Sequence, residues 1–519
     1  MRKKLTDLLR ILDISNISNI SNSVNPEINN LQLDSRAVKP GNLFFAYPGT
    51  NLDGRDYVNN ALDNGASFIL YEPYEQGYNK PRLDNNNSLA VKNLSQYISQ
   101  IAAEFYNNPS AEQNIYAITG TNGKTTCSYL IAGLLSASSN STKVGVIGTT
   151  GYGEISDLLN NRINKLSTTT PDPILLQKIL HDFQKAGIQD IVLEASSHAL
   201  SQYRLSGVNI KTAIFTNLSH DHLDYHDSLE EYYLAKKKLF YFPSIRNIAI
   251  NIDDQYGQRL LTDLAADRLA DKNKKNIMLY SLNNNNFNNY LGLFAKDIKY
   301  YFNVTKIKLV LDDCGLDLTT KLMGEFNVYN LLAAIASLYI NKLHINLADV
   351  ILNLNTAPGR MERMNCAQKQ VAVIIDYAHT PDALEQVLKA LRTLKIFNKI
   401  WCVFGCGGDR DKTKRPEMGA VAARYADKII ITDDNPRTED PKQITAEVVS
   451  GINSMNSINS NNYIIINDRK EAIKTALLEA ESGDVVVIAG KGHEDYQIYG
   501  QTKLDYNERV FVRDLVKNY

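Results

Sequence analysis

The sequence has few of the features that would place a protein in an oxidising compartment, in a bilayer or on a polyanion. Five cysteines are scattered over 519 residues without a CxxC pair, which is typical of free thiols in a reducing cytosol. No run of about 18 apolar residues occurs, so no membrane-spanning helix is expected. The net charge of −1 offers no global attraction for nucleic acid or anionic lipid. We therefore expect a cytoplasmic protein that holds anionic ligands only at local sites.

Apolar patterning and turn residues divide the chain into three expected α/β domains. The expected boundaries give residues 1–110, 111–355 and 356–519. In the first domain, apolar strands over 43–46 and 68–71 and a helix over 56–64 indicate a small α/β fold. The central domain begins with the pattern of a phosphate-binding loop, described below.

The last domain repeats strand and helix with a regular period. Its expected strands cover residues 371–375, 400–404, 428–431, 463–466 and 485–488. This alternation predicts a parallel, Rossmann-like sheet whose ligands bind beyond the carboxyl ends of the strands. Low-complexity stretches over 14–22, 283–286 and 453–462 are interpreted as solvated loop insertions without catalytic residues.

A phosphate-binding loop is predicted between an apolar strand over 115–118 and a helix-like run that begins at Thr125. Its sequence is Gly120-Thr-Asn-Gly-Lys-Thr-Thr126. Backbone N–H groups and the helix N-terminus can wrap phosphates there, Lys124 can reach the β/γ oxygens, and the Thr125 hydroxyl can bind Mg²⁺. Ile118 stands where a strict eight-residue pattern has its first glycine, so a chance glycine-rich turn is the alternative. The loop predicts a nucleotide site but does not identify a reaction.

Acidic and histidine residues follow two more expected strands. Glu194 and His198 come after one strand, and Asp221, His222 and Asp224 come after the next. Side chains of this kind, next to a phosphate loop, can bind the Mg²⁺ ions that neutralise a transferring phosphate. The alternatives are structural ones, since a single histidine is often a satisfied structural residue and Asp224 could cap a helix.

Residues 229–240 are expected to form a helix that carries three consecutive lysines. Lys236 has apolar neighbours at helical spacing, and a desolvated lysine is shifted toward its neutral form, which can react with CO₂ to give an anionic carbamate. Lys237 has equally apolar neighbours, so periodicity does not single out Lys236. Surface lysines that extend their charged ends to solvent are the alternative.

The order of these motifs resembles that of the Mur ligase family over nearly the whole chain. The matching segments are Gly120–Thr126, Glu194–His198, Asp221–Asp224, Tyr232–Lys236, Asn327–Asn330, Gly359–Glu362 and Asp376–Pro381. Four further segments favour the diaminopimelate-adding branch of the family, namely Leu33–Arg36, Gly407–Arg410, Asp434–Arg437 and Gly490–Glu494.

The resemblance implies an ATP-dependent amide ligase of peptidoglycan precursor synthesis. It would add meso-2,6-diaminopimelate to UDP-MurNAc-L-Ala-D-Glu through an acyl phosphate, with Mg²⁺ as cofactor and without nucleic-acid partners or membrane insertion. The implied fold has an N-terminal uridine-nucleotide domain, a central ATPase-like parallel-sheet domain and a C-terminal Rossmann-like domain that binds the added amino acid.

The resemblance also implies roles for individual residues. ATP would be bound by Gly120, Thr121, Asn122, Gly123, Lys124, Thr125, Thr126, Asn327, Arg360, Asp376 and His379. Magnesium would be bound by Thr125, Glu194, His222 and carbamylated Lys236. The UDP-linked substrate would be bound by Leu33, Ser35, Thr50, Asn51, Leu52, Thr169, Thr170, Ser196, Gln202 and Arg204. Diaminopimelate would be bound by Arg410, Asp434, Asn435, Pro436, Arg437, Gly490 and Glu494.

Three alternatives remain open at the level of sequence. A lysine-adding ligase is disfavoured by Arg437, and a folylpolyglutamate synthetase by the Asp34-Ser-Arg36 segment, which suits a nucleotide-sugar site. A P-loop regulatory ATPase would hydrolyse ATP without the other substrates. Thr168 occupies a place where relatives often have Asn, which leaves that substrate contact open.

Overall fold

A computed structural model describes most of the chain. It covers residues 1–12, 25–50, 52–74, 87–138, 143–160, 162–219, 225–267, 275–283, 287, 289–311, 314–343, 345–354, 356–366, 368–455 and 462–517. Two compact units are present, Met1–Leu293 with Ala333–Ile345 and Phe294–Leu332 with Asn346–Tyr519. The expected boundaries near residues 110 and 355 stay predictions. Of the expected loop insertions over 14–22, 283–286 and 453–462, residues 14–22, 284–286 and 456–461 lie outside the described residues, whereas Asn453 is the last residue of a helix that begins at Pro441.

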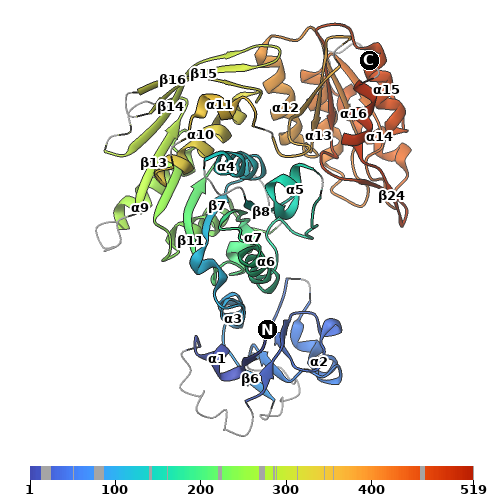
Figure 1. Ribbon diagram of the computed structural model, residues 1–519. Helices are drawn as coiled ribbons and strands as arrows, with labels where there is room; N and C mark the ends of the chain where they lie inside the picture. Colours follow the sequence, from blue (N-terminus) through green and yellow to red (C-terminus); the bar gives the residue numbers. More distant parts are fainter. Residues whose placement is uncertain are drawn as a thin grey trace. The chain divides into compact units, whose positions relative to one another are not determined.

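The N-terminal part of the first unit, coloured blue in Figure 1, is built around a small parallel sheet in the order β3-β4-β5-β6. The strands of this part are β1 (Lys3–Lys4), β2 (Glu27–Ile28), β3 (Asn30–Gln32), β4 (Asn42–Ala46), β5 (Phe68–Tyr71) and β6 (Ser88–Ala90), of which β1 and β2 form a separate antiparallel pair. Its helices are α1 (Leu5–Leu9), α2 (Val58–Asp63) and α3 (Ile98–Phe105). The strands predicted over 43–46 and 68–71 are confirmed, and the helix predicted over 56–64 is the 3₁₀ turn Gly54–Tyr57 followed by α2.

The central part of the first unit contains a larger sheet in the order β13-β12-β11-β7-β10-β8-β9, which is parallel except for β9. Its strands are β7 (Asn114–Thr119), β8 (Val144–Gly148), β9 (Gly151–Glu154), β10 (Asp190–Glu194), β11 (Ile210–Phe215), β12 (Asn247–Asn251) and β13 (Asn276–Ser281). Its helices are α4 (Lys124–Ser138), α5 (Ile155–Leu159), α6 (Pro173–Lys185), α7 (Ser197–Ser201), α8 (Leu229–Lys237) and α9 (Gln255–Asp267). Helix α4 packs on β7, β8 and β10.

The second unit carries a six-stranded sheet in the order β17-β18-β22-β19-β20-β21. The strands of the whole unit are β15 (Thr305–Leu311), β16 (Cys314–Thr320), β17 (Glu362–Cys366), β18 (Val371–Asp376), β19 (Ile400–Phe404), β20 (Lys428–Ile431), β21 (Tyr463–Ile465), β22 (Val485–Ala489), β23 (Tyr496–Tyr499) and β24 (Thr502–Asp505), of which β15, β16, β23 and β24 lie outside this sheet. Its helices are α11 (Leu347–Ile351), α12 (Pro381–Leu394), α13 (Lys414–Tyr425), α14 (Pro441–Asn453), α15 (Arg469–Glu479) and α16 (Glu508–Val516). Strand β14 (Leu291–Tyr300) and helix α10 (Glu325–Ile340) are divided between the two units. The expected parallel sheet is confirmed, with β17 added antiparallel.

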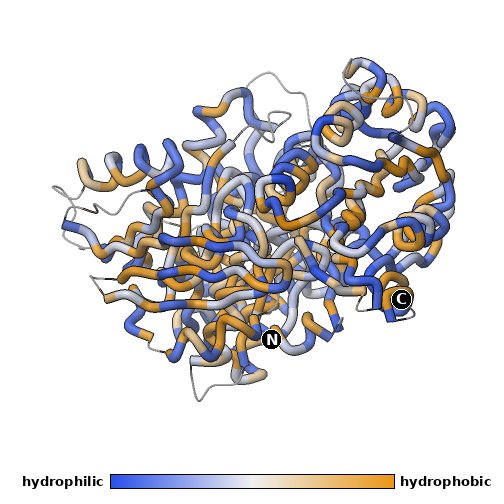
Figure 2. Tube along the Cα trace, turned by 90° about the horizontal axis from the view of Figure 1, so that it is seen from above, coloured by the Kyte–Doolittle hydropathy of each residue, from blue (hydrophilic) through white to orange (hydrophobic). Residues whose placement is uncertain are grey.

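The C-terminal sheet is covered by helices on both faces. Val373 of β18 packs into a cluster with Leu477 of α15, whereas Ile374 packs into another with Leu388 of α12. Adjacent residues of a strand point to opposite faces, so continuous apolar strands require cover on both sides. In Figure 2 the helices carry orange and blue residues side by side, as expected for amphipathic helices. No helix within the described ranges is both long and apolar enough to cross a membrane.

Candidate active site

The predicted phosphate loop connects the carboxyl end of β7 to the N-terminus of α4. Gly123 has a φ of +86°, a left-handed conformation that favours glycine, and a Cβ on Gly120 would lie 1.9 Å from Thr216 Oγ1. Lys124 Nζ donates to the carbonyls of Gly120 and Thr121, each at 2.8 Å. The ammonium group of Lys124 therefore lies against the loop, in a position from which it could contact a bound phosphate.

Strand β11 braces this loop from the neighbouring position in the sheet. Asn217 Oδ1 accepts from the Asn122 N–H at 2.9 Å, and the Thr216 hydroxyl donates to the Asn122 carbonyl at 2.7 Å. The Thr121 hydroxyl donates to Ser219 O at 3.3 Å. Sequence analysis did not assign Thr216 or Asn217 to the site, although both follow an apolar strand of a parallel sheet.

Glu194 lies at the end of β10, fully buried and turned toward the first turn of α4. Its Oε2 accepts from the hydroxyls of Thr125 at 2.9 Å and Thr149 at 3.0 Å, and its Oε1 accepts from the Thr149 N–H at 3.0 Å. A carboxylate buried with three donors is held in one orientation. Thr149 was missed because nothing in its local sequence marks it.

The donor set beside the phosphate loop suits magnesium. Mg²⁺ in nucleotide sites binds one or two carboxylates, a hydroxyl and phosphate oxygens, and Thr125 Oγ1 and Glu194 Oε2 supply the protein part of such a set. Among the described residues no cluster of three His, Cys, Asp or Glu side chains could bind a metal alone. The predicted ligand His222 lies outside the described residues, together with Asp221 and Asp224.

The three consecutive lysines of α8 have different environments. Lys236 is 1% exposed, lies 4.2 Å from the centre of the Tyr232 ring, and donates to the Gly120 carbonyl at 2.8 Å. Lys237 is half-buried and paired with Asp263, and Lys238 is exposed. Burial therefore distinguishes Lys236 from Lys237 and Lys238, which the pattern of apolar neighbours could not do. Its ammonium group lies against the predicted phosphate loop.

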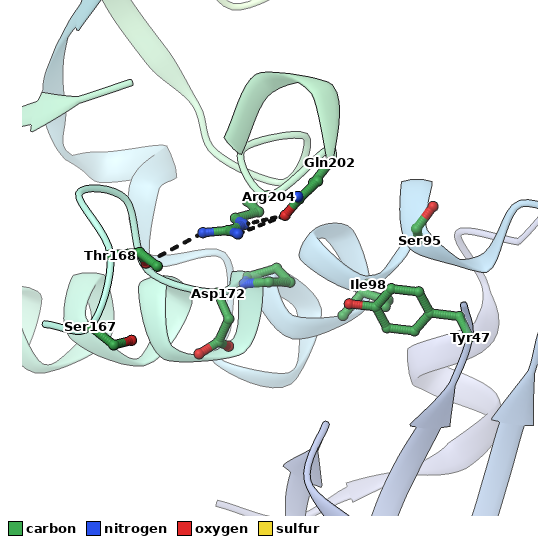
Figure 3. A pocket seen from close by; sticks show the side chains of 9 residues that line it. Tyr47, Ser95, Ile98, Ser167, Thr168, Asp172, Gln202 and Arg204 are labelled. Atoms are coloured by element: carbon green, nitrogen blue, oxygen red, sulfur yellow. Dashed lines mark hydrogen bonds between the residues drawn. The ribbon is translucent and has the colours of Figure 1, made fainter. Parts of the chain in front are cut away.

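A cavity of about 170 Å³ lies between the N-terminal and central parts of the first unit (Figure 3). It is lined by Tyr47, Ser95, Ile98, Ser167, Thr168, Asp172, Pro173, Gln202 and Arg204. The Arg204 guanidinium donates to Gln202 Oε1 at 2.6 and 3.0 Å and to the Thr170 carbonyl at 2.7 Å. Burial lowers the pKa of Arg204 and raises the pKa of Tyr47. A half-buried arginine that lines a cavity suits an anionic ligand.

The residues predicted for the UDP-linked substrate are only partly brought together. Gln202 and Arg204 line the cavity, as does Thr168. The Thr170 hydroxyl donates a hydrogen bond to the Ser196 hydroxyl at 3.2 Å. Thr169 lies within 3.1 Å of Thr149. Four others do not line the cavity: half-buried Leu33, buried Ser35, and exposed Thr50 and Leu52. Asn51 lies outside the described residues.

The ATP contacts predicted in the second unit gather around β18. Arg360 lies 4.7 Å from the centre of the Tyr377 ring, and the Tyr377 carbonyl lies 2.8 Å from His379 Nδ1. The buried carboxylate of Asp376 accepts from the N–H groups of Met361 and Ala378, and desolvation raises its pKa. Asn327 is buried in α10 and donates to Met323 O at 2.8 Å.

The predicted amino-acid pocket lies where loops leave β19, β20 and β22. The Gly408 N–H donates to Asn435 O at 2.9 Å, and Arg437 Nη1 donates to Gly408 O at 2.6 Å. Glu494 Oε2 accepts from Asn435 Nδ2 at 3.1 Å. Arg437 is half-buried, whereas Arg410 is exposed. Gly490 follows β22 with a φ of +113°, and Pro436 is buried in the loop that follows β20.

Buried groups that sequence analysis missed hold these loops together. Arg415 is 1% exposed and donates to Glu439 at 2.9 and 3.0 Å, to Glu447 at 2.7 Å and to Gly407 O at 3.1 Å. The Tyr499 hydroxyl donates to Asp433 at 3.1 Å. The hairpin β23–β24 thereby braces the segment that presents Arg437. No local signal marks these residues, because their partners are distant in sequence.

Three sequence models of one family match the chain along most of its length. The model of the Mur ligase family, catalytic domain, matches residues 27–106, that of the Mur ligase middle domain matches residues 118–338, and that of the Mur ligase, glutamate ligase domain, matches residues 359–492. The chain belongs to the Mur ligase family. The family resemblance and the three-domain α/β fold predicted from the motifs are confirmed.

Curated members of this Mur ligase family are similar over nearly their full lengths. A Pseudomonas putida protein named UDP-N-acetylmuramoyl-L-alanyl-D-glutamate–2,6-diaminopimelate ligase is 41% identical over 94% of each chain. A Caldanaerobacter subterraneus protein of the same name is 36% identical over 98% of this chain and 99% of its own. A solved structure of that name is 37% identical, covers 95% of each chain and has a TM-score of 0.67. A Thermotoga maritima MurF ligase solved with ADP, 20% identical at a TM-score of 0.57 over 89% of this chain and 93% of its own, shares the fold.

Proposed function

We propose that this Mur ligase adds meso-2,6-diaminopimelate to UDP-MurNAc-L-Ala-D-Glu and converts ATP to ADP and phosphate, in peptidoglycan precursor synthesis. The observation that carries the proposal is 41% identity, over 94% of both chains, to a ligase named for these substrates. The geometry of the three sites described above supports the same chemistry. ATP then has the phosphate loop with Lys124, the UDP-linked substrate has the cavity with Arg204, and diaminopimelate has the pocket with Arg437.

The first step is phosphoryl transfer from ATP to the carboxylate of the glutamyl residue. A free carboxylate is a poor acylating agent, and the acyl phosphate formed carries a better leaving group. Lys124 would stabilise the negative charge of the transferring phosphate, and the N–H groups of the loop would orient it. Arg360, Asp376 and His379 would contact ATP from the second unit.

Magnesium, when bound, would neutralise the phosphate oxygens. Thr125 and Glu194 would hold it, and His222 and a carbamate on Lys236 are the further proposed ligands. The burial of Lys236 supports the carbamate, because a desolvated amine is shifted toward the neutral form that reacts with CO₂.

The second step is attack of a neutral amine on the acyl phosphate. The C–N bond forms, a tetrahedral intermediate expels phosphate, and the amine proton passes to solvent or to a neighbouring base. Arg437 and Arg410 would bind the distal carboxylate of diaminopimelate, and Asp434 and Glu494 its distal ammonium group. Free L-lysine has an amine at that end and no carboxylate, so the arginines would favour diaminopimelate.

An ADP-release assay with paired substrates tests the proposal. Purified protein is given ATP and Mg²⁺ with UDP-MurNAc-L-Ala-D-Glu, together with meso-diaminopimelate, L-lysine or no amine. We expect rapid ADP release only with the dipeptide substrate and diaminopimelate, and a tripeptide product by mass spectrometry. Release of ADP that does not depend on the other substrates would instead identify a regulatory ATPase.

A further inference from the structure

Lys491 is a fully buried lysine in the centre of the predicted amino-acid pocket. It lies two residues beyond the end of β22, and its side chain is 0% exposed. Its Nζ lies 3.0 Å from Asp434 Oδ1, 3.2 Å from Glu494 Oε2 and 3.1 Å from Asn435 Oδ1. The three residues proposed above to receive the amino acid therefore share one buried ammonium group.

The charges of this cluster do not cancel. Two carboxylates, Asp434 and Glu494, face the single ammonium of Lys491, so these three side chains carry a net charge of −1 when all are ionised. The nearby cation Arg469, whose charge also acts on Asp434, is itself paired with buried Glu508. A buried charge without compensation is costly, and this excess favours a further cation. The cluster thus resembles a cation site that Lys491 occupies only in part.

Asp434 has an acceptor left for such a cation. Its Oδ1 is buried and forms the ion pair with Lys491, but it accepts no well-aligned hydrogen bond from the residues that the structure describes. Glu494, by contrast, accepts from Asn435 Nδ2 at 3.1 Å and from Lys491 at 3.2 Å. A carboxylate oxygen can accept two hydrogen bonds, so Oδ1 has room for a further donor from a ligand beside the ammonium of Lys491.

The surrounding residues fix the cluster in place. Asn435 Oδ1 accepts from the Ile498 N–H at 3.0 Å, and Gln497 donates to the Asp434 carbonyl at 3.1 Å. Arg437, two residues beyond Asn435, has a φ of +51° and is held by hydrogen bonds from its N–H to Ile498 O at 3.0 Å and from the Gly500 N–H to its carbonyl at 2.6 Å. The acidic cluster and the arginine are thus presented by one rigid segment.

We propose that Lys491 is a positioning residue for the added amino acid. Its ammonium holds Asp434, Asn435 and Glu494 together and cancels one carboxylate charge, which leaves the other charge for the ammonium group of the substrate. Together with Arg437, the pocket then offers one negative and one positive position to a zwitterionic amino-acid end. The inference rests on the proposed function, because it assigns diaminopimelate to this pocket.

The test compares Lys491→Met and Lys491→Arg with the matched control Lys503→Met. Lys503 is exposed and lies over the same Tyr496 ring, 4.0 Å from its centre against 5.7 Å for Lys491, but it forms no ion pair with the residues that the structure describes. We expect Lys491→Met to raise KM for diaminopimelate roughly 10- to 100-fold, the loss of hydrogen bonds to a charged group. KM for ATP and for the UDP-linked substrate should change by less than about 2-fold, and Lys491→Arg should recover part of the loss.

Each other outcome has a defined meaning. An unchanged KM for diaminopimelate in Lys491→Met, an equal rise in all three KM values, or failure of both variants to fold would assign Lys491 to structure alone and overturn the inference. A wild-type protein without diaminopimelate-dependent ADP release would instead reject the proposed function. An effect of Lys503→Met as large as that of Lys491→Met would also overturn the inference, because the charge of the hairpin would then explain it.

Discussion

The phosphate loop of the first unit and the amino-acid pocket of the second are built in different ways. The predicted phosphate loop is one continuous segment, Gly120–Thr126, whose proposed binding groups are mainly backbone N–H groups and one lysine. The amino-acid pocket combines loops after three strands and depends on buried side chains such as Arg415 and Lys491. In a site made from one continuous backbone segment, substitutions at only a few residues should lower activity. In a site assembled from several loops, substitutions at many positions that do not touch the substrate should also lower activity.

The largest effect is expected from Lys124→Ala. The side chain contributes charge at the phosphates and donates only to carbonyls of its own loop, so turnover should fall by at least about 10²–10³-fold with little change in the melting temperature. Steady-state ADP release and circular dichroism melting measure the two. Near-normal turnover in a folded variant would remove the phosphate-loop assignment.

Lys236→Ala should nearly stop turnover as well, because a buried lysine against the loop would be lost as a magnesium ligand. Lys237→Ala and Lys238→Ala are the matched controls, and both should be mild, since these lysines are half-buried and exposed. Turnover of the three variants should be measured with and without added bicarbonate. Equal losses in all three, or a bare ammonium at Lys236 in a high-resolution map with bound ADP, would contradict the carbamate.

Arg437→Ala should weaken diaminopimelate binding by about 2–5 kcal/mol, the usual cost of removing one partner of a buried charged pair. Lysine should be used almost as poorly as before, because it has no distal carboxylate. The comparison requires kcat/KM for both amines in the variant and in Arg410→Ala, whose side chain is exposed and should matter less. Equal losses for both amines would mean that Arg437 does not select the substrate.

The smallest expected effect is on stability at acid pH. Hydrogen bonding to Arg415 lowers the pKa of Glu439 from 4.5 to about 2, so the folded state binds its proton less tightly than the unfolded chain. The resulting stabilisation is complete above about pH 4.5 and is lost as the pH falls toward 2. Melting temperatures of wild type and Glu439→Gln should therefore converge over this range. A constant difference down to pH 2 would show that the pair does not titrate there.

Sequence reasoning succeeded where the relevant residues are neighbours in the chain. The strands over 371–375 and 485–488, and the strand and helix on either side of the predicted phosphate loop, were predicted within a residue or two of their observed bounds. Alternation, glycine position and helix start are local properties. It failed for Thr149 and Arg415, whose partners Glu194 and Glu439 lie 45 and 24 residues away. Local sequence patterns do not reveal contacts between residues that are so far apart in the chain.

The sequence by itself determined the family and the parallel sheets, and it predicted the segments proposed to carry the chemistry. Only the tertiary structure decided which lysine of α8 is buried, which residues line the cavity around Arg204, and that Lys491 lies between two carboxylates. The physical reason is that burial and charge pairing depend on strands and loops from distant parts of the chain. Local periodicity fixes the direction of a side chain within its own element, whereas the groups that it meets are fixed only when the elements pack.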